Sequence, residues 1–115
     1  MAARLIPKTD ESEFPYEEVR RRLFENPSTR VRPFDFGPMI EAGKRMGWTE
    51  EMIRTNEELS HRGRCFAFEM TQEPFLRGTL YEDNVFFSFS GAEHERASMH
   101  AIEGLAREFD VRVLR

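Results

Sequence analysis

The chain has 115 residues, of which 39% are hydrophobic and 12% aromatic, and its formal net charge is −4. This length and composition exclude a disordered chain and predict a single domain over residues 1–115. The single cysteine excludes an internal disulfide, and the sequence shows neither a signal peptide nor a run of about 18 apolar residues. We therefore predict a cytoplasmic protein.

The first half of the sequence predicts mainly helices. Residues 1–12 are polar and contain a proline, so we expect them to be loosely ordered. A helix should begin near Pro15 and end at Asn26 and Pro27, because apolar residues recur at helical spacing between these positions. Residues 30–34 indicate a short strand, which their proline would confine to a sheet edge.

Two further helices are predicted over residues 38–46 and 50–62, joined by a tight connection at Gly47 and Trp48. Thr49 is the expected N-cap of the second of these helices, because its hydroxyl can accept a hydrogen bond from an amide of the first turn. The N-terminal half is therefore predicted to be helical.

After residue 63 the pattern changes to strands. Alternating apolar residues predict a half-buried strand over 65–70, and two more strands follow over 76–82 and 85–90. Asp83 and Asn84 are the expected two-residue turn of a hairpin. Because residues of a strand alternate between faces, we expect one face to carry Leu76, Leu80, Phe87 and Phe89, and the other to carry Arg77, Thr79, Tyr81, Phe86, Ser88 and Ser90.

A capping box at residues 90–93 predicts the start of the longest helix, which should run to about Phe109. Residues 111–114 close the chain as a strand, and a strand, a helix and a strand joined by short loops predict a parallel crossover. The predicted fold class is α+β. It has a helical N-terminal half followed by β-β-β-α-β, with one mainly antiparallel four-stranded sheet packed with helices.

The sequence predicts no catalytic, cofactor or metal site. Cys65 is the one thiol, and His61 lies four residues before it across a predicted helix–strand break. His94 and His100 are six residues apart on the long helix and do not share a face, whereas His100 and Glu103 have a spacing suited to metal ligands but lack a third ligand.

Two surfaces are candidates for binding. The second face of the sheet, around Tyr81 and Phe86, is more apolar than an ordinary solvent-facing sheet. It should be covered by the chain's own helices, by a second subunit or by a ligand, and these alternatives stay open. The other candidate is the acidic side of the helix over 50–62, which carries Glu50, Glu51, Glu57 and Glu58.

We therefore predict a small binding or interaction domain without enzymatic activity, with a homodimer or another protein partner as the expected assembly. One alternative is a small enzyme that uses Cys65 or a histidine in a sheet-lined pocket. The others are an acidic inhibitor or immunity-type partner of a basic protein, and a DNA binder that resembles a winged helix in the outline of its elements. The acidic third helix disfavours nucleic acid, no membrane partner is expected, and no motif identifies a small-molecule ligand.

Overall fold

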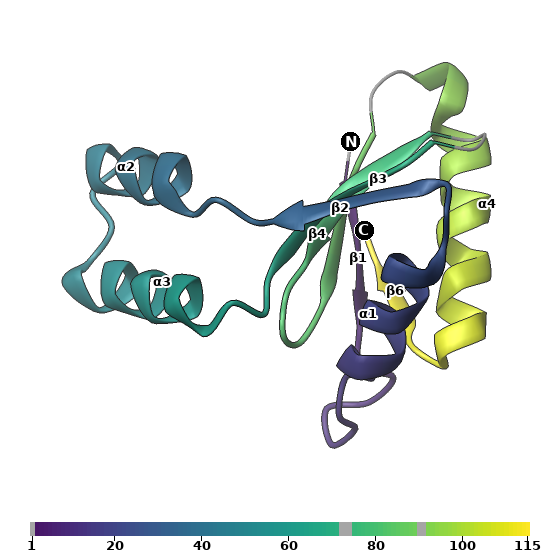
Figure 1. The fold of residues 1–115 in the computed structure, drawn as a ribbon, viewed down its shortest axis with the longest axis horizontal. Coiled ribbons are helices and arrows are strands. Elements are labelled where there is room, and N and C mark those ends of the chain that lie inside the picture. The colour runs from purple at the N-terminus through teal and green to yellow at the C-terminus, as the bar shows by residue number, and fades with distance from the viewer. Residues whose placement is uncertain (1, 72–74, 90–91) are drawn as a thin grey trace.

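The computed structural model describes residues 2–71, 75–89 and 92–115 (Figure 1). Its strands in these ranges form one six-stranded sheet in the order β2-β3-β4-β5-β1-β6, with every neighbouring pair antiparallel. The α+β class is confirmed, and the prediction of four strands is wrong. The elements are β1 (Ala2–Ile6), α1 (Tyr16–Glu25), β2 (Thr29–Pro33), α2 (Gly37–Arg45), α3 (Glu50–Arg62), β3 (Phe66–Met70), β4 (Leu76–Leu80), β5 (Val85–Ser88), α4 (Ala92–Phe109) and β6 (Arg112–Leu114).

Strand β1 lies inside the sheet, although the sequence had indicated a loosely ordered segment over residues 1–12. It pairs with β5 on one side and with β6 on the other. Ala3 and Leu5 point into the core and are buried. Strand β1 has five residues and two buried side chains, and this alternation is too short to indicate a strand from the sequence. Its place in the sheet is set by pairing with β5 and β6.

The order of the last strands also differs from the simplest expectation. Because β1 is antiparallel to both β5 and β6, these two strands run in the same direction, as a crossover through α4 requires. The two strands are separated by β1, so they do not pair with each other. The predicted capping box at 90–93 includes residues outside the described part of the chain.

The turn between β4 and β5 falls one residue earlier than predicted. The Tyr81 amide donates a hydrogen bond to the Asn84 carbonyl at 2.8 Å, which makes Glu82 and Asp83 the turn residues. Asn84 instead contacts β1, because its side-chain oxygen accepts a hydrogen bond from Arg4 Nη1 at 2.8 Å. A tertiary contact with β1 therefore fixes this residue outside the turn.

The earlier turn changes the register but not the faces. Leu80 is opposite Val85, and Phe86 is opposite Thr79 instead of Tyr81. The partner of each residue moves by two positions, and a shift of two leaves the described side chains on their predicted sides of the sheet. Ser90, predicted on the outer side, lies outside the described residues. The predicted apolar side is confirmed, since it packs in the core with Leu76, Leu80, Phe87 and Phe89.

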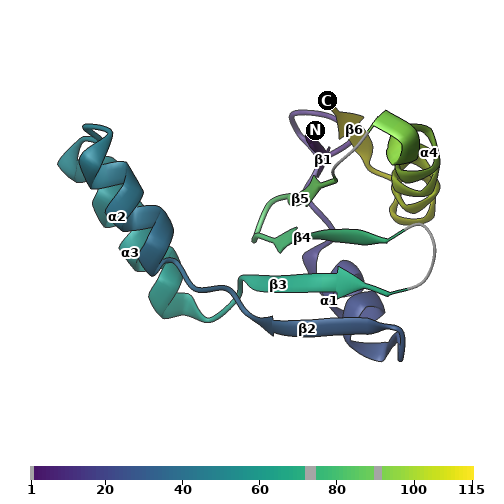
Figure 2. The ribbon, with the colours of Figure 1, turned by 90° about the horizontal axis from the view of Figure 1, so that it is seen from above.

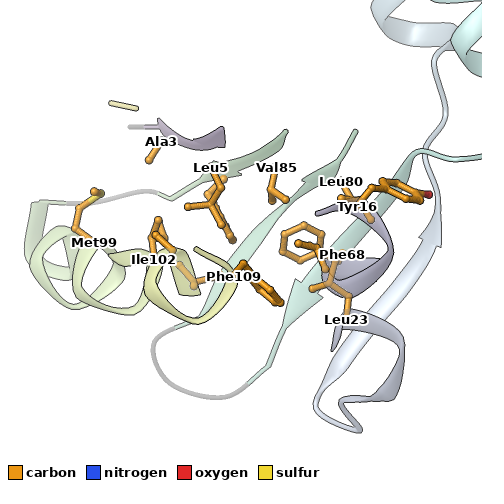
Figure 3. Packing of buried hydrophobic residues seen from close by; sticks show 14 residues of the cluster. Ala3, Leu5, Tyr16, Leu23, Phe68, Leu80, Val85, Met99, Ile102 and Phe109 are labelled. Carbon is orange, nitrogen blue, oxygen red and sulfur yellow. The ribbon is translucent and has the colours of Figure 1, made fainter. Parts of the chain in front are cut away.

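Helices α1 and α4 cover that apolar side of the sheet (Figures 1 and 2). Phe68 of β3 and Phe87 of β5 meet edge to face in the middle of the core, with 5.6 Å between ring centroids. Figure 3 shows the strand side chains directed toward the two helices. Helix α1 contributes Tyr16, Val19 and Leu23 to this cluster, and α4 contributes Met99, Ile102, Ala106 and Phe109.

Helices α2 and α3 do not join this layer and instead form a hairpin that projects beyond the ends of β2 and β3 (Figures 1 and 2). We call residues 36–63 the arm. At its base the Phe34 amide donates to the Cys65 carbonyl at 3.0 Å, which continues the β2–β3 register. The radius of gyration is 14.7 Å, against about 13 Å for a compact chain of this length. The arm is therefore an insertion at the tip of the β2–β3 hairpin.

Local sequence explains the arm's helices well. Helix α3 has the predicted bounds, and its first-turn Met52 amide donates to Thr49 Oγ1 at 3.2 Å, as expected of an N-cap. Gly63 ends the helix in the left-handed conformation, with φ of 65°. Gly43 of α2 lies against the Trp48 ring so closely that a Cβ would overlap it, which fixes the angle between the helices.

A glycine in β4 tests the packing of the sheet. A Cβ on Gly78 would overlap the Phe86 carbonyl oxygen and lie 2.9 Å from Cζ of Phe68. We predict that Gly78→Ala lowers the free energy of unfolding by about 1–3 kcal/mol, measured by urea denaturation. Gly104→Ala is the control, because the nearest atom to a Cβ there is 4.0 Å away, and it should raise stability by about 0.5–1 kcal/mol. Equal stability of the two variants would contradict this packing.

Candidate functional site

The side of the sheet opposite α1 and α4 is not covered by the chain's own helices, because α2 and α3 stand apart in the arm (Figure 2). We call this side the open face. Cross-strand pairing arranges its side chains in rows. One row holds Arg30, Glu69, Arg77 and Ser88, and the next holds Arg32, Ala67, Thr79, Phe86 and Arg4.

The open face is basic, although the whole chain carries a net charge of −4. Among the outward-pointing residues of the six described strands, Glu69 is the one carboxylate, and the arginines are Arg4, Arg30, Arg32, Arg77 and Arg112. Counting charges along the sequence does not reveal this patch, because its members come from β1, β2, β4 and β6. The strand order brings them together.

A pocket of about 410 Å³ lies at the centre of the open face. Its floor consists of short side chains of the central strands, including Ala67, Thr79 and Ser88. Arg32 and Phe86 stand on opposite sides of this floor, in the same row. Arg30, Phe34, Asp35, Glu69 and Arg77 complete the wall.

The arginines of the pocket form no ion pairs with the carboxylates that the structure describes. In the part of the chain that the structure describes, Arg30, Arg32 and Arg77 have no carboxylate oxygen within 4.0 Å. Asp35 is oriented toward the arm, because its Oδ1 accepts a hydrogen bond from the Gly37 amide at 2.9 Å. The pocket therefore presents guanidinium groups whose donors are available to a ligand.

Tyr81 and Phe86, the aromatic residues predicted as an interaction surface, both lie on the open face. Tyr81 is half-buried and meets Phe34 at 5.9 Å between ring centroids, and burial raises the pKa of its hydroxyl. Phe86 lines the pocket and lies under the guanidinium of Arg4, whose Cζ is 4.9 Å from the ring centroid. Only Phe86 is a pocket residue.

The acidic residues predicted as the second part of this surface lie elsewhere. Helix α3 carries them on the arm, apart from the open face (Figure 2). Arg54 lies among them at spacings of three and four residues, which weakens their combined field. The structure therefore does not bring the two predicted parts together, and it leaves the four carboxylate side chains exposed at Glu50, Glu51, Glu57 and Glu58.

The arm also exposes apolar side chains. Met46, at the end of α2, is 78% exposed, and Met52, in the first turn of α3, is 45% exposed. All 13 residues of α3 are described and none of them is buried. The tip of the arm thus exposes two thioether side chains, a residue type that adapts readily to partner surfaces.

Cys65 is placed poorly for nucleophilic chemistry. The residue is 4% exposed, and burial, with a smaller contribution from the nearby Glu82 carboxylate, raises the pKa of its thiol. His61 is exposed on α3. A protonated thiol is a weak nucleophile, so the arrangement does not favour the reaction that the sequence left open.

The histidines of α4 belong to no metal-binding cluster of described side chains. His94 and His100 are both exposed. Glu103 forms an ion pair with Arg115 at 3.6 Å, so it is engaged by a cation. The described residues contain no cluster of three or more His, Cys, Asp or Glu side chains that could hold a metal ion.

Comparisons with models of protein families, with curated proteins and with solved structures gave no match to this chain. No helix among the described residues is long and apolar enough to span a lipid bilayer.

Cys65 should react slowly with a disulfide reagent at neutral pH. Because folding raises the pKa of its thiol, the folded chain holds this proton more tightly than the unfolded chain. The protonated thiol therefore contributes to the free energy of unfolding. This contribution is complete below the ordinary thiol pKa of 9.0 and is lost as the pH rises through the higher pKa of the folded state. The absorbance of the thiolate released from the reagent measures the labelling rate. Cys65 should be labelled at least about tenfold more slowly in the folded protein than in denaturant.

The control for this labelling is a double variant with Cys65→Ala and Ser60→Cys, which moves the thiol to an exposed site on α3. Its thiol should react at the rate of the unfolded chain. Labelling of Cys65 in the folded protein as fast as in this control would contradict its burial.

Proposed function

We propose that this protein is a non-enzymatic interaction domain that pairs with a second copy through the arm. One observation carries the proposal: the arm is helical, yet Phe36 and Gly43 are the only buried residues among its described positions 36–63, and Met46 is 78% exposed. Most helical stability in proteins comes from packing of an apolar face. A two-helix hairpin packs only along its inner seam, so the arm requires a partner.

The apolar residues that remain accessible lie on both helices. Met39 and Ile40 of α2 are half-buried, as are Ile53 and Leu59 of α3. Two such hairpins packed against each other form a four-helix bundle, in which half-buried positions become core positions. Pairing of two arms supplies the missing layer.

Charge favours a second copy as the partner. Residues 37–62 contain five glutamates and four lysines or arginines, so two arms approach each other with little repulsion. Lys44 and Arg45 lie in the last turn of α2, and Glu50 and Glu51 lie in the first turn of α3. A two-fold arrangement can place the basic end of one α2 beside the acidic end of the partner's α3.

The open face is less suited to self-association, although a dimer through the sheet was among the predictions. A two-fold axis through the pocket places the same patch of each copy face to face. The basic patches that contain Arg30, Arg32 and Arg77 would then face each other, and bringing two patches of like charge together is costly. This argument supports the arm over the sheet as the dimer interface.

Light scattering at micromolar concentration tests the proposal. The unaltered protein should have the mass of a dimer, and Met52→Glu should raise the dissociation constant at least about tenfold, because it places a carboxylate in the apolar layer. Leu114→Glu is the matched control: Leu114 is 51% exposed and Met52 is 45% exposed, but Leu114 lies on β6. The control should remain a dimer.

A monomer over the whole concentration range would refute self-association. A dimer that persists in Met52→Glu and dissociates in Leu114→Glu would move the interface from the arm to the β6 edge of the sheet.

A further inference from the structure

We propose that the pocket on the open face binds a small organic anion that contains a planar ring. A carboxylate or phosphate group would be held by Arg30, Arg32 and Arg77, and the ring would pack against Phe86. This site does not depend on the pairing of the arms, because its lining residues come from the sheet and from the start of the β2–α2 connection.

The arginines supply the anion-binding chemistry. Arg30 of β2 and Arg77 of β4 are each directly opposite Glu69 of β3, yet neither forms an ion pair with it. A single carboxylate can compensate only one of them, and Arg32 adds a further positive charge to the same wall. Planar guanidinium groups offer paired donors that match the oxygen atoms of carboxylates and phosphates.

The aromatic wall is held in place before any ligand arrives. Arg4 lies over the Phe86 ring at 4.9 Å and donates to the side-chain oxygen of Asn84 at 2.8 Å, so an anchored guanidinium covers one face of the ring. On the other side, Phe34 is edge to face with Phe36 at 4.7 Å. Fixed walls reduce the entropy that binding must remove, so they favour a ligand of matching shape.

The size of the pocket and the polarity of its floor suit a small molecule. Its volume of about 410 Å³ falls within the range of about 300–1,000 Å³ typical of ligand sites. Thr79 and Ser88 add hydroxyl groups to the floor, beside the methyl group of Ala67. A flat ring can lie over Ala67 while polar atoms at its edge bond to the hydroxyl groups.

A nucleic-acid strand fits these features less well than a small anion. The chain is acidic overall, and binding of a polyanion gains affinity from many phosphate contacts along an extended basic track. Here the wall formed by Phe34 and Asp35 bounds the pocket on the side of the arm. One face of Phe86 is also occupied by Arg4, which leaves less of the ring for stacking with successive bases.

Titrations followed by amide chemical shifts and by calorimetry test this site. Adenosine monophosphate and benzoate serve as the phosphate and carboxylate probes with a ring, and inorganic phosphate and acetate serve as probes without one. At least one ring-bearing probe should bind saturably, one to one, at millimolar concentration or below. Its shifts should centre on β2–β5, and the matching probe without a ring should bind more weakly.

Two substitutions locate the binding and a third controls for charge. Arg32→Ala and Ala67→Leu should each weaken binding at least about tenfold, the first by removing a donor and the second by filling the floor. Both side chains point outward on the sheet, and circular dichroism should show unchanged folding. Arg107→Ala removes an exposed arginine from α4, on the other side of the sheet, and should leave the affinity unchanged.

Absence of saturable binding by both ring-bearing probes would overturn the proposal, as would equal affinity in Arg32→Ala and the unaltered protein. Binding of a single-stranded oligonucleotide, without binding of the small probes, would replace it with a nucleic-acid surface. Met52→Glu should bind the probe normally, so a failure of arm pairing and a failure of the pocket are distinguishable.

Discussion

The contact between Phe68 and Phe87, with 5.6 Å between ring centroids, is the interaction on which the rest of the structure depends. It lies in the part of the sheet that α1 and α4 cover together, and it belongs to a core that includes Leu5 of β1. Helices α1 and α4 are enough to cover one side of this sheet. Helices α2 and α3 therefore need not pack on the sheet, and they project beyond the ends of β2 and β3. The uncovered side of the sheet and the projecting arm are both consequences of this one-sided core.

The open face and the arm differ in charge and polarity, which suits them to different partners. The open face carries arginines from four strands, and those of β2 and β4 line a pocket with a floor of short side chains. The arm is nearly neutral, and Met46 and Met52 are exposed at its tip. The charge of the open face resists self-association and favours an anion. The apolar surface of the arm favours burial against another helical surface. The arm and the open face therefore correspond to the two proposals, pairing of two copies and binding of a small anion.

The sequence predicted the features that depend on local pattern. The bounds of α3, its Thr49 cap and the apolar side of the β4–β5 hairpin follow from residues close together in the chain. It did not predict β1, because Ala3 and Leu5 give a signal only once β5 and β6 lie beside them. The basic pocket was missed for the same reason, since Arg77 of β4 joins Arg30 and Arg32 of β2 only through strand pairing across β3. The turn was misplaced because Asn84 bonds to Arg4, a residue 80 positions away.

Removal of the arm tests most directly whether the one-sided core is sufficient by itself. The Phe34 amide and the Cys65 carbonyl are bonded at 3.0 Å, so residues 36–63 can be replaced by an Asn-Gly turn that continues the β2–β3 register. This replacement also removes the ion pair between Arg62 and Glu82 at the base of the arm, in which the Arg62 side chain is exposed. Thermal unfolding of the shortened chain, followed by circular dichroism, should remain a single cooperative transition. At temperatures below this transition the spectrum should still show β-sheet. A shortened chain without a cooperative transition would show that the arm is part of the folding core and would contradict the account.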